Sequence, residues 1–206
     1  AEGEGGSAVN VTKIEALSGG AVWLLTETEG AIRIDTNPED YSLTSQWYSA
    51  QSGQFSATRV FGVYEDLLGN EWILSDNGLG MLTAGQTTPT SYFVDAAERE
   101  KKGGQAFYSC LEYNSEIYFG SDNGRVWCYQ KENGQFQLQN LPASSRIVSI
   151  NSVEGNELIF TTAKDGFFSY QPKTKAIEHF PASRFPNASI HSVYVDKASE
   201  VWFEQH

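Results

Sequence analysis

Four acidic residues stand at one fixed distance before an aromatic residue. Each acid precedes a Trp, Tyr or Phe by six positions, and the pairs are Asp66/Trp72, Glu112/Tyr118, Glu154/Phe160 and Asp196/Trp202. Paired carboxyl groups could act as general acid and base, as they do in glycoside hydrolases. Regular recurrence argues against catalysis, because a catalytic pair needs two carboxyl groups in unlike surroundings. We therefore predict that these acids cap hairpin turns through their side-chain oxygens.

A second set of acids lies in short turns, and arginines lie in segments expected at the same edge of the fold. The acids are Glu29, Asp76, Asp122 and Asp165, and the arginines are Arg59, Arg99, Arg146 and Arg184. A guanidinium group can hold a carboxylate through two hydrogen bonds, and it can also bind polar groups of a ligand. Two hypotheses stay open at this point: exposed ion pairs between neighbouring units, or a surface that receives sugar hydroxyls.

Two adjacent aromatic residues, Trp47 and Tyr48, precede the polar segment 49–53. Aromatic rings near a polar rim could stack on a carbohydrate, although both residues also suit the core positions of a strand. The predicted ligand-binding set comprises Arg59, Arg146, Arg184, Asp76, Asp122, Asp165, Trp47 and Tyr48.

The sequence lacks the common catalytic and metal-binding motifs. It contains no His-Glu-x-x-His, Cys-x-x-Cys or Gly-x-Ser-x-Gly, and no phosphate-binding Gly-Lys-Ser/Thr loop. Cys110 and Cys128 are expected in the first and third strands of one sheet, roughly 9–10 Å apart, which is too far for a disulfide. His179 alternates with Ile177 and is expected on an edge strand. We predict two free thiols, no metal, no cofactor and no catalytic residue.

The aromatic residues also mark an internal repeat. Successive intervals of 49, 46, 42 and 42 residues separate Trp23, Trp72, Tyr118, Phe160 and Trp202. A period of about 40–50 residues is typical of propellers and solenoids. Glycine-containing turns between apolar stretches predict antiparallel hairpins, which a parallel solenoid does not contain. The predicted fold is therefore all-β: a β-propeller with blades of four antiparallel strands.

The repeat predicts about four complete blades and one half blade. A flexible segment, 1–10, precedes blades at 11–50, 54–97, 104–142 and 145–182, and an incomplete blade at 189–206. The second strand of each blade is almost continuously apolar, which indicates burial on both faces. A short helical turn is expected at 95–102. The incomplete blade should expose a strand edge and an apolar face that could pair with other blades or chains.

Composition and charge exclude several partners. The chain has 206 residues and a formal net charge of −12, which disfavours binding to nucleic acid or to an anionic membrane surface. No apolar run approaches the roughly 20 residues of a membrane span. We therefore expect a membrane connection only through other parts of a longer protein.

The segment 64–80 resembles the two-component-regulator propeller repeat, whose core reads acidic-Asp-x-x-Gly-x-x-Trp-Ile-Gly-Thr-x-x-Gly-Leu. The matching residues are Asp66, Gly69, Trp72, Ile73, Gly78 and Leu79, whereas Leu74 replaces the usual glycine. Weaker copies extend the likeness over most of residues 12–204. No ligand-binding residue of that family maps onto this sequence.

This resemblance implies the periplasmic sensor region of a hybrid histidine kinase, on the periplasmic or extracellular side of a bacterial membrane. Ligands in that family are often oligosaccharides. The predicted function is therefore a non-catalytic sensor propeller for a glycan-derived ligand. Two alternatives are a five-bladed propeller glycoside hydrolase and a protein-interaction scaffold.

Overall fold

The computed structural model describes residues 9–94, 106–153, 156–184, 190–196 and 200–205. Within these ranges the chain is strand and turn, apart from one 3-10 turn, η1, at Ala182–Arg184. No helix there is both long enough and apolar enough to cross a membrane. The chain divides into two compact units, residues 1–94 and 95–206. The predicted helical turn at 95–102 lies outside the described residues.

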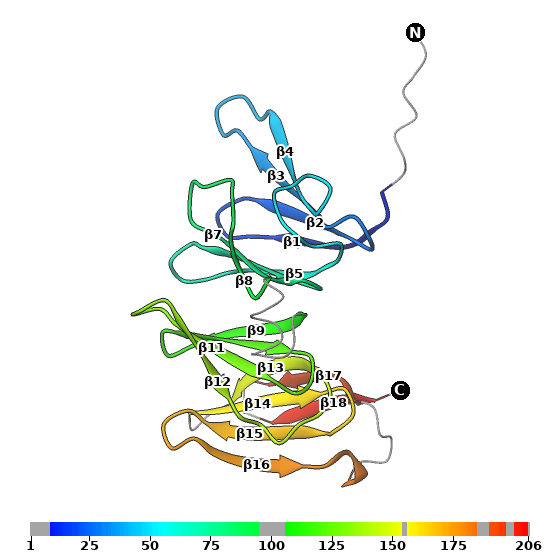
Figure 1. The fold of residues 1–206 in the computed structure, drawn as a ribbon, viewed down its shortest axis with the longest axis vertical. Coiled ribbons are helices and arrows are strands. Elements are labelled where there is room, and N and C mark those ends of the chain that lie inside the picture. Colours follow the sequence, from blue (N-terminus) through cyan, green and yellow to red (C-terminus); the bar gives the residue numbers. More distant parts are fainter. Residues whose placement is uncertain (1–8, 95–105, 154–155, 185–189, 197–199, 206) are drawn as a thin grey trace. The chain divides into compact units, whose positions relative to one another are not determined.

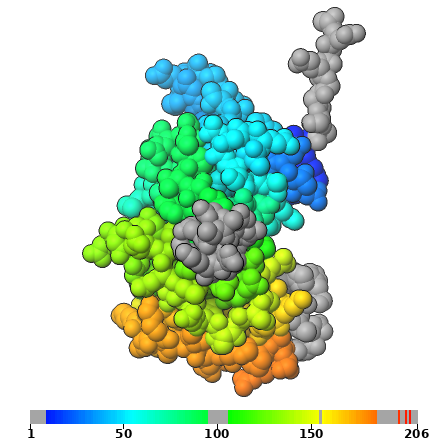
Figure 2. Space-filling view, in the orientation of Figure 1, coloured from blue at the N-terminus to red at the C-terminus, as the bar shows by residue number. Residues whose placement is uncertain are grey.

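The first unit contains two four-stranded antiparallel sheets, each in simple sequential order (Figure 1). The first blade consists of β1 (Val11–Ala16), β2 (Val22–Thr26), β3 (Ala31–Thr36) and β4 (Leu43–Tyr48). The second consists of β5 (Val60–Glu65), β6 (Glu71–Ser75), β7 (Gly78–Leu82) and β8 (Thr90–Tyr92). The end of the β3–β4 hairpin projects from the surface of this unit (Figure 2).

The second unit repeats this plan. The third blade has β9 (Phe107–Tyr113), β10 (Glu116–Ser121), β11 (Val126–Gln130) and β12 (Gln135–Gln139). The fourth has β13 (Ile147–Val153), β14 (Glu157–Thr162), β15 (Phe167–Gln171) and β16 (Ala176–Phe180), and a two-stranded sheet follows with β17 (Ile190–Val195) and β18 (Val201–Gln205). The prediction of four blades and a half blade is confirmed, and His179 lies on the edge strand β16 as expected.

The second strand of each complete blade is largely buried, as predicted. In β6, β10 and β14 every residue after the first is buried. Trp23, Trp72 and Tyr118 have no exposed surface, whereas Trp202 in β18 is 58% exposed. We call the sheet face that carries Trp23 and its equivalents the back face of a blade, and the opposite face the front face.

The sequence predicts Phe160 as the fourth-blade equivalent of Trp23, Trp72 and Tyr118, and this assignment is wrong by one residue. The last residue of β2, β6, β10 and β14 occupies one structural position: Thr26, Ser75, Ser121 and Thr162 pair in turn with Val11, Val60, Phe107 and Ile147. Counting back three positions from each gives Trp23, Trp72, Tyr118 and Ile159. Phe160 is therefore on the front face of its blade, because a shift of one residue along a strand reverses the face. Ile159, which is 4% exposed, takes the back-face position.

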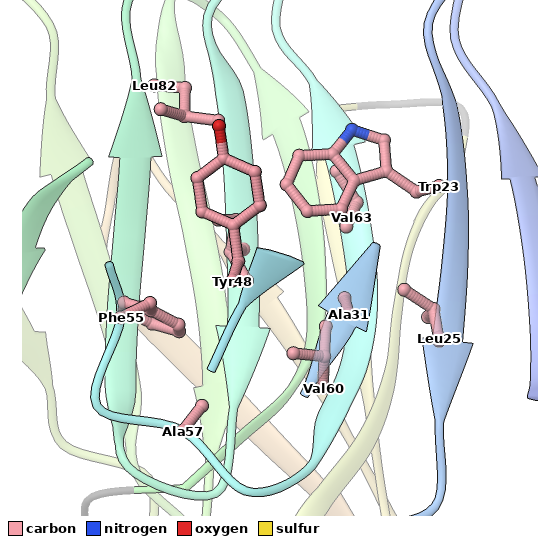
Figure 3. Packing of buried hydrophobic residues seen from close by; sticks show 10 residues of the cluster. Trp23, Leu25, Ala31, Tyr48, Phe55, Ala57, Val60, Val63 and Leu82 are labelled. Carbon is pink, nitrogen blue, oxygen red and sulfur yellow. The ribbon is translucent and has the colours of Figure 1, made fainter. Parts of the chain in front are cut away.

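Within each unit, the two complete blades pack back face against front face. In the first unit, Trp23, Leu25 and Tyr48 on the back of the first blade form one buried cluster with Val63 and Ile73 on the front of the second (Figure 3). In the second unit, a corresponding cluster includes Tyr118, Cys128, Ile150, Phe160 and Phe168. Burial of one large aromatic side chain removes about 150–250 Å² from water, so these rings dominate the cohesion between blades.

Cys110 lies in β9 and Cys128 in β11, with β10 between them. Both are free thiols, which confirms the geometric prediction. Burial raises the pKa of the Cys128 thiol to about 12, so this residue is an unreactive core side chain.

One glycine per blade is required by both backbone and space. Gly30, Gly78, Gly124 and Gly166 all have positive φ, in the turn between the second and third strands. A Cβ atom on Gly30 would lie 2.2 Å from the carbonyl oxygen of Tyr48, and one on Gly166 would lie 2.1 Å from that of Phe180. The repeated glycine therefore lets this turn approach the end of the fourth strand.

A substitution at Gly30 can be used to separate the effect of positive φ from the effect of the close contact with the fourth strand. Gly30→Ala should lower the free energy of unfolding by about 2–4 kcal/mol, because positive φ and a backbone clash act together. Gly20→Ala is the matched control: its φ is +91°, yet no atom lies within 4 Å of the added Cβ. The control should cost only ~1–2 kcal/mol, from the backbone alone. Equal losses in urea unfolding would contradict the close-approach explanation.

Candidate functional site

The turn between the second and third strands lies against the segment that joins one blade to the next. In the first unit, Gly30 N donates to Thr58 O at 2.8 Å and Asp76 N donates to Arg59 O at 3.0 Å. In the second unit, Ala163 N donates to Arg146 O at 3.0 Å. We call this side of a blade the connection edge, and most of the predicted ligand-binding residues lie on it.

Asp76 and Asp165 use their carboxylates to hold the connecting segment. The backbone N–H groups of Thr58 and Arg59 each donate to Asp76 Oδ1 at 3.1 Å, and the Thr58 hydroxyl donates to Oδ2. Asp165 accepts bonds from the backbone N–H and hydroxyl groups of Ser144 and Ser145, at 2.7–3.0 Å. Both acids therefore have a structural role at the connection edge.

These bonds set the ionisation of Asp165. Burial acts to raise the pKa of its carboxyl group, but the hydrogen bonds from Ser145 and Ser144 outweigh burial and lower the pKa to about 2. The carboxylate is thus stabilised by fixed donors and stays charged at any pH near neutral.

The predicted arginines contact aromatic rings. The guanidinium carbon of Arg59 lies 5.3 Å from the centre of the Phe61 ring, and that of Arg146 lies 5.3 Å from the centre of the Tyr108 ring. Both arginines are exposed. Among the residues that the structure describes, no carboxylate forms an ion pair with either guanidinium. The hypothesis of ion pairs along this edge is therefore wrong for these two residues.

The other members of the set occupy varied positions. Arg184 is exposed in η1, and Asp122 is half-buried, with its backbone N–H donating to Ala106 O at 3.2 Å. The backbone N–H of Glu29 donates to the hydroxyl of Thr26. Arg99 lies outside the described residues.

Trp47 and Tyr48 point to opposite faces of β4. Tyr48 is 1% exposed, and its ring centre lies 5.0 Å from that of Trp23. Its hydroxyl donates to Thr87 O at 3.0 Å, and burial raises the pKa of this hydroxyl to about 12. Tyr48 is therefore a core residue, and its prediction as a ligand-stacking ring is wrong because no face of the ring is accessible. Trp47 is half-buried on the front face of the first blade.

The capping prediction is confirmed for two of the four recurring acids. Asp66 Oδ1 accepts from the backbone N–H groups of Leu68 and Asn70, at 2.9 and 3.0 Å, and Oδ2 accepts from Trp72 Nε1 at 3.0 Å. Asp196 accepts likewise from Glu200 N at 3.0 Å and from Trp202 Nε1 at 3.1 Å. An Asp six residues before a Trp therefore caps a turn and also accepts a hydrogen bond from the indole N–H of that Trp.

The other two acids do not repeat this arrangement. Glu112 lies within β9 and pairs with Lys131, so its prediction as a turn cap is wrong. The hairpin that follows turns through Asn114 and Ser115, whose φ values of 51° and 65° suit a tight two-residue turn without a side-chain cap. Glu154 lies outside the described residues.

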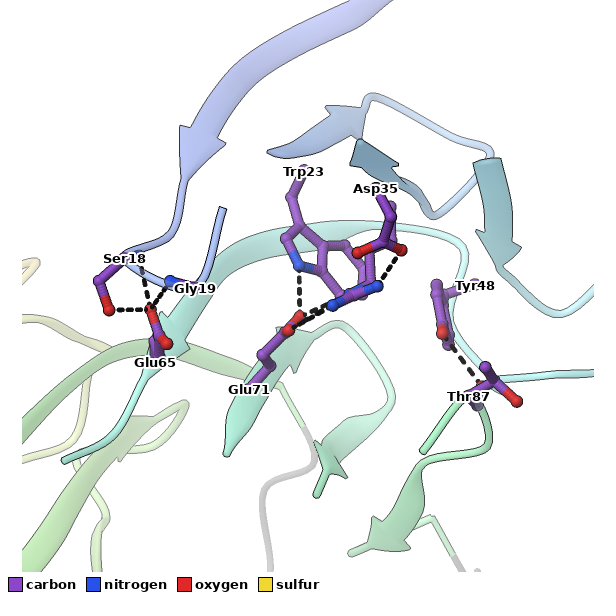
Figure 4. Close-up of polar contacts among 9 residues, drawn as sticks. Ser18, Gly19, Trp23, Asp35, Tyr48, Glu65, Glu71 and Thr87 are labelled. Carbon is purple, nitrogen blue, oxygen red and sulfur yellow. Dashed lines mark hydrogen bonds and ion pairs between the residues drawn. The ribbon is translucent and has the colours of Figure 1, made fainter. Parts of the chain in front are cut away.

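A polar cluster between the first and second blades was not predicted. The Arg33 guanidinium donates to Glu71 through Nη2 at 2.8 Å and Nε at 2.9 Å, and it also pairs with Asp35 (Figure 4). Trp23 Nε1 donates to Glu71 Oε2 at 2.7 Å. The side chains of Glu71 and Arg33 are 13% and 22% exposed. Glu71 of the second blade is therefore held by two residues of the first.

One sequence signal could have revealed this cluster. Arg33 interrupts the apolar strand Ala31-Ile32-Arg33-Ile34, and register places it opposite Trp23 on the same face. A charge at a buried strand position implies an opposite charge nearby. The partner itself, 38 residues later, depends on how the blades pack.

A row of buried hydroxyl groups was also missed. Thr26, Ser75 and Thr162 close the second strands and are at most 1% exposed. Each donates to the carbonyl oxygen of the turn glycine at 2.8–2.9 Å. Their recurrence three positions after the repeated aromatic in the first two blades is visible in the sequence.

Other surface features carry less chemistry. An open hollow in the β7–β8 loop is lined by Gly85, Gln86, Thr87 and Thr88, and Gln46 Nε2 and the Tyr48 hydroxyl both donate to Thr87 O. In the described part of the chain, no three His, Cys, Asp or Glu side chains gather as a metal site would need.

Comparison with solved structures identifies the architecture. The WD40 propeller domain of Doa1 matches with a TM-score of 0.65 at 10% identity, over 94% of this chain and 60% of that one. The chain folds as part of a β-propeller. No family model and no curated protein sequence matches it.

Two bacterial structures match the propeller fold more closely. One is the extracellular domain assigned to the hybrid two-component system BT4673 of B. thetaiotaomicron, with a TM-score of 0.74 at 17% identity over 98% of this chain. The other is that of BT3049 from the same organism, with a TM-score of 0.70 at 19% identity over 94%. The chain spans 27% and 25% of these structures, about a quarter of their length.

Removing the charge of Glu71 tests the polar cluster. Glu71→Gln should lower the free energy of unfolding by about 1–3 kcal/mol, because Arg33 then keeps a largely buried charge with a weaker partner. Asp35→Asn is the control, since the Asp35 side chain is 44% exposed and should cost at most ~1 kcal/mol. Similar losses for both variants in chemical denaturation would refute the importance of the inter-blade bond.

Acid titration tests the role of Asp165. Its folded pKa of about 2 lies below the ordinary value of 3.8, so its stabilisation is complete only above roughly pH 5 and is lost progressively as pH falls through 3.8 to below 2. Asp165→Asn should reduce stability at pH 7 and flatten the loss between pH 4 and 2. Glu132→Gln removes the charge of another exposed acid and controls for the change in net charge. An unaltered acid profile in Asp165→Asn would count against the capping role.

Proposed function

We propose that this chain is part of a non-catalytic, extracytoplasmic sensor propeller of a two-component system, and that it detects a glycan-derived ligand. The observation that carries the proposal is the match to the extracellular domains of BT4673 and BT3049, which extends over nearly all of this chain. The repeat resemblance at residues 64–80 supports the same class of protein.

The connection edge offers groups suited to a polar ligand. Arg59 and Arg146 are exposed and rest on aromatic rings, so their guanidinium groups are oriented before any ligand arrives. Such fixed donors lose little side-chain entropy when they bind oxygen atoms. Asp76 and Asp165 position the segments that carry these arginines, and they contribute indirectly. The proposed binding residues form two separate sets: Arg59 and the half-buried Trp47 in the first unit, and Arg146, Arg184 and Asp122 in the second.

The arrangement of acids favours a sensor over a glycoside hydrolase. Asp66 and Asp196 each hold a turn and an indole N–H, and Glu112 pairs with Lys131. A carboxylate committed to fixed hydrogen bonds is a poor proton donor, because its charged form is favoured; accordingly the pKa of Asp66 is lowered despite burial.

Calorimetry following an oligosaccharide array tests this proposal. We expect at least one oligosaccharide to bind without being cleaved, and Arg59→Ala or Arg146→Ala to weaken binding about tenfold, as loss of one charge-assisted hydrogen bond would. Lys173→Ala is the control, because Lys173 is an exposed cation in the turn after β15. Cleavage of the bound sugar would support the hydrolase instead. Binding of peptides with no sugar binding would support the scaffold.

A further inference from the structure

The turn between β14 and β15 gathers basic residues from several segments of the second unit. The turn itself carries Lys164. The backbone N–H of Ala163 donates to Arg146 O at 3.0 Å, which brings in the segment that enters the fourth blade. His179 Nε2, on the edge strand β16, donates to the carbonyl oxygen of Asp165 at 2.7 Å. Three basic residues therefore meet at one turn of the connection edge.

Arg184 lies beside the same turn. A Cβ atom on Gly166, which ends the turn, would lie 2.6 Å from Ala182 N, at the start of η1. Arg184 closes η1 and donates its backbone N–H to Pro181 O at 3.0 Å. The four basic residues are all exposed, and within the described parts of the chain none pairs with a carboxylate: Arg146, Lys164, His179 and Arg184. Their polar groups are therefore available to a ligand.

The acids near this turn leave a local excess of positive charge. The Asp165 carboxylate already accepts hydrogen bonds from two serines of the connecting segment. Asp122 stands in the equivalent turn of the third blade. These two acids are outnumbered by three permanent positive charges, those of Arg146, Lys164 and Arg184. A chain with a formal net charge of −12 therefore has a locally positive edge here.

This positive charge does not recur with the repeat. The string Glu27-Thr28-Glu29 in the first blade stands where the fourth blade has Ala163-Lys164-Asp165, because Thr26 and Thr162 occupy one structural position. Structural features of the blade recur, as the turn glycine and the buried hydroxyl group do. A lysine that the other complete blades lack at this turn points instead to a role particular to the fourth blade.

We infer that the connection edge of the fourth blade binds an acidic glycan, one whose sugars carry carboxylate or sulfate groups. The inference rests on the proposed function, which supplies the sugar, and it adds the charge of the ligand. The forked guanidinium groups of Arg146 and Arg184 match the geometry of such an anion, and Lys164 adds a point charge. His179 Nδ1 has no hydrogen bond to a described residue, so in the neutral ring it can accept one from a sugar hydroxyl.

Salt distinguishes this site from one for a neutral sugar. Exposed opposite charges attract over distances that salt screens, about 10 Å at 0.1 M. Binding of an acidic oligosaccharide should therefore weaken as salt rises. Binding of a neutral oligosaccharide, through hydrogen bonds and ring contacts, should change little.

Calorimetry with matched acidic and neutral sugars tests the inference. An oligogalacturonide and a galactose oligosaccharide of the same length and linkage differ only in carrying a carboxylate or a hydroxymethyl group on each sugar. A sulfated galactose oligosaccharide and its desulfated form make a second pair, which separates sulfate from carboxylate recognition. At least one acidic member should bind about tenfold more tightly than its neutral partner, the gain from one charge-assisted hydrogen bond.

Substitutions locate the binding on the fourth blade. Lys164→Gln and Arg184→Gln should each weaken binding of the acidic sugar about tenfold and leave binding of a neutral sugar unchanged. Lys164→Arg keeps the charge and should keep the binding. Lys173→Gln is the matched control, because it removes one exposed positive charge from the turn at the other end of β15. Circular dichroism establishes that each variant is folded.

Four outcomes would overturn the inference. If neutral sugars bind as tightly as acidic ones, the proposed function stands and the acidic site does not. If no oligosaccharide binds, the proposed function fails and this inference fails with it. Equal binding of inorganic sulfate or polyglutamate would mean a general anion site. Equal losses in Lys164→Gln and Lys173→Gln would mean that net charge, and not this edge, governs binding.

Discussion

Each complete blade is organised around one buried side chain in the middle of its second strand. A buried aromatic ring needs apolar cover on its faces and, for Trp or Tyr, an acceptor for its polar hydrogen. Trp72 finds that acceptor in Asp66 of its own blade. In the first blade Leu17 stands where an acid would be needed, and Trp23 donates instead to Glu71 of the second blade. One hydrogen-bonding requirement is thus met within a blade in one case and between blades in the other.

Glu71, the acceptor for Trp23, also helps to hold the two blades of the first unit together. Because it accepts from both Trp23 and Arg33, it fixes β2 and β3 of the first blade against β6 of the second. A carboxylate that is 13% exposed is stabilised only when such donors surround it. The connection edge supplies a second link, through the turn glycines and the acids Asp76 and Asp165. Consecutive blades in a unit are therefore joined by apolar packing and by directional polar contacts together.

The structural roles of these acids limit where a functional site can lie. Four of the recurring acids, Asp66, Asp196, Asp76 and Asp165, hold turns or connecting segments, so these members of the acidic repeat act in folding. The exposed arginines Arg59 and Arg146, which lie against aromatic rings, remain available for contacts with a ligand. Groups held on a rigid edge lose little entropy when they bind a ligand.

The sequence by itself determined the all-β class, the blade count, the strand order and the free thiols, because hairpin turns, repeat period and strand spacing are local properties. It also located the turn caps Asp66 and Asp196. The tertiary structure decided which face each side chain occupies. Phe160 and Ile159 differ by one position, and only the register of β14 against its neighbours shows which of them faces back. Tyr48 lies in the core, Arg146 lies against the ring of Tyr108, and Arg33 binds Glu71, because those contacts join residues from different strands or blades. Local patterns fix the period of a repeat protein, whereas the partner of each side chain depends on long-range packing that no single repeat contains.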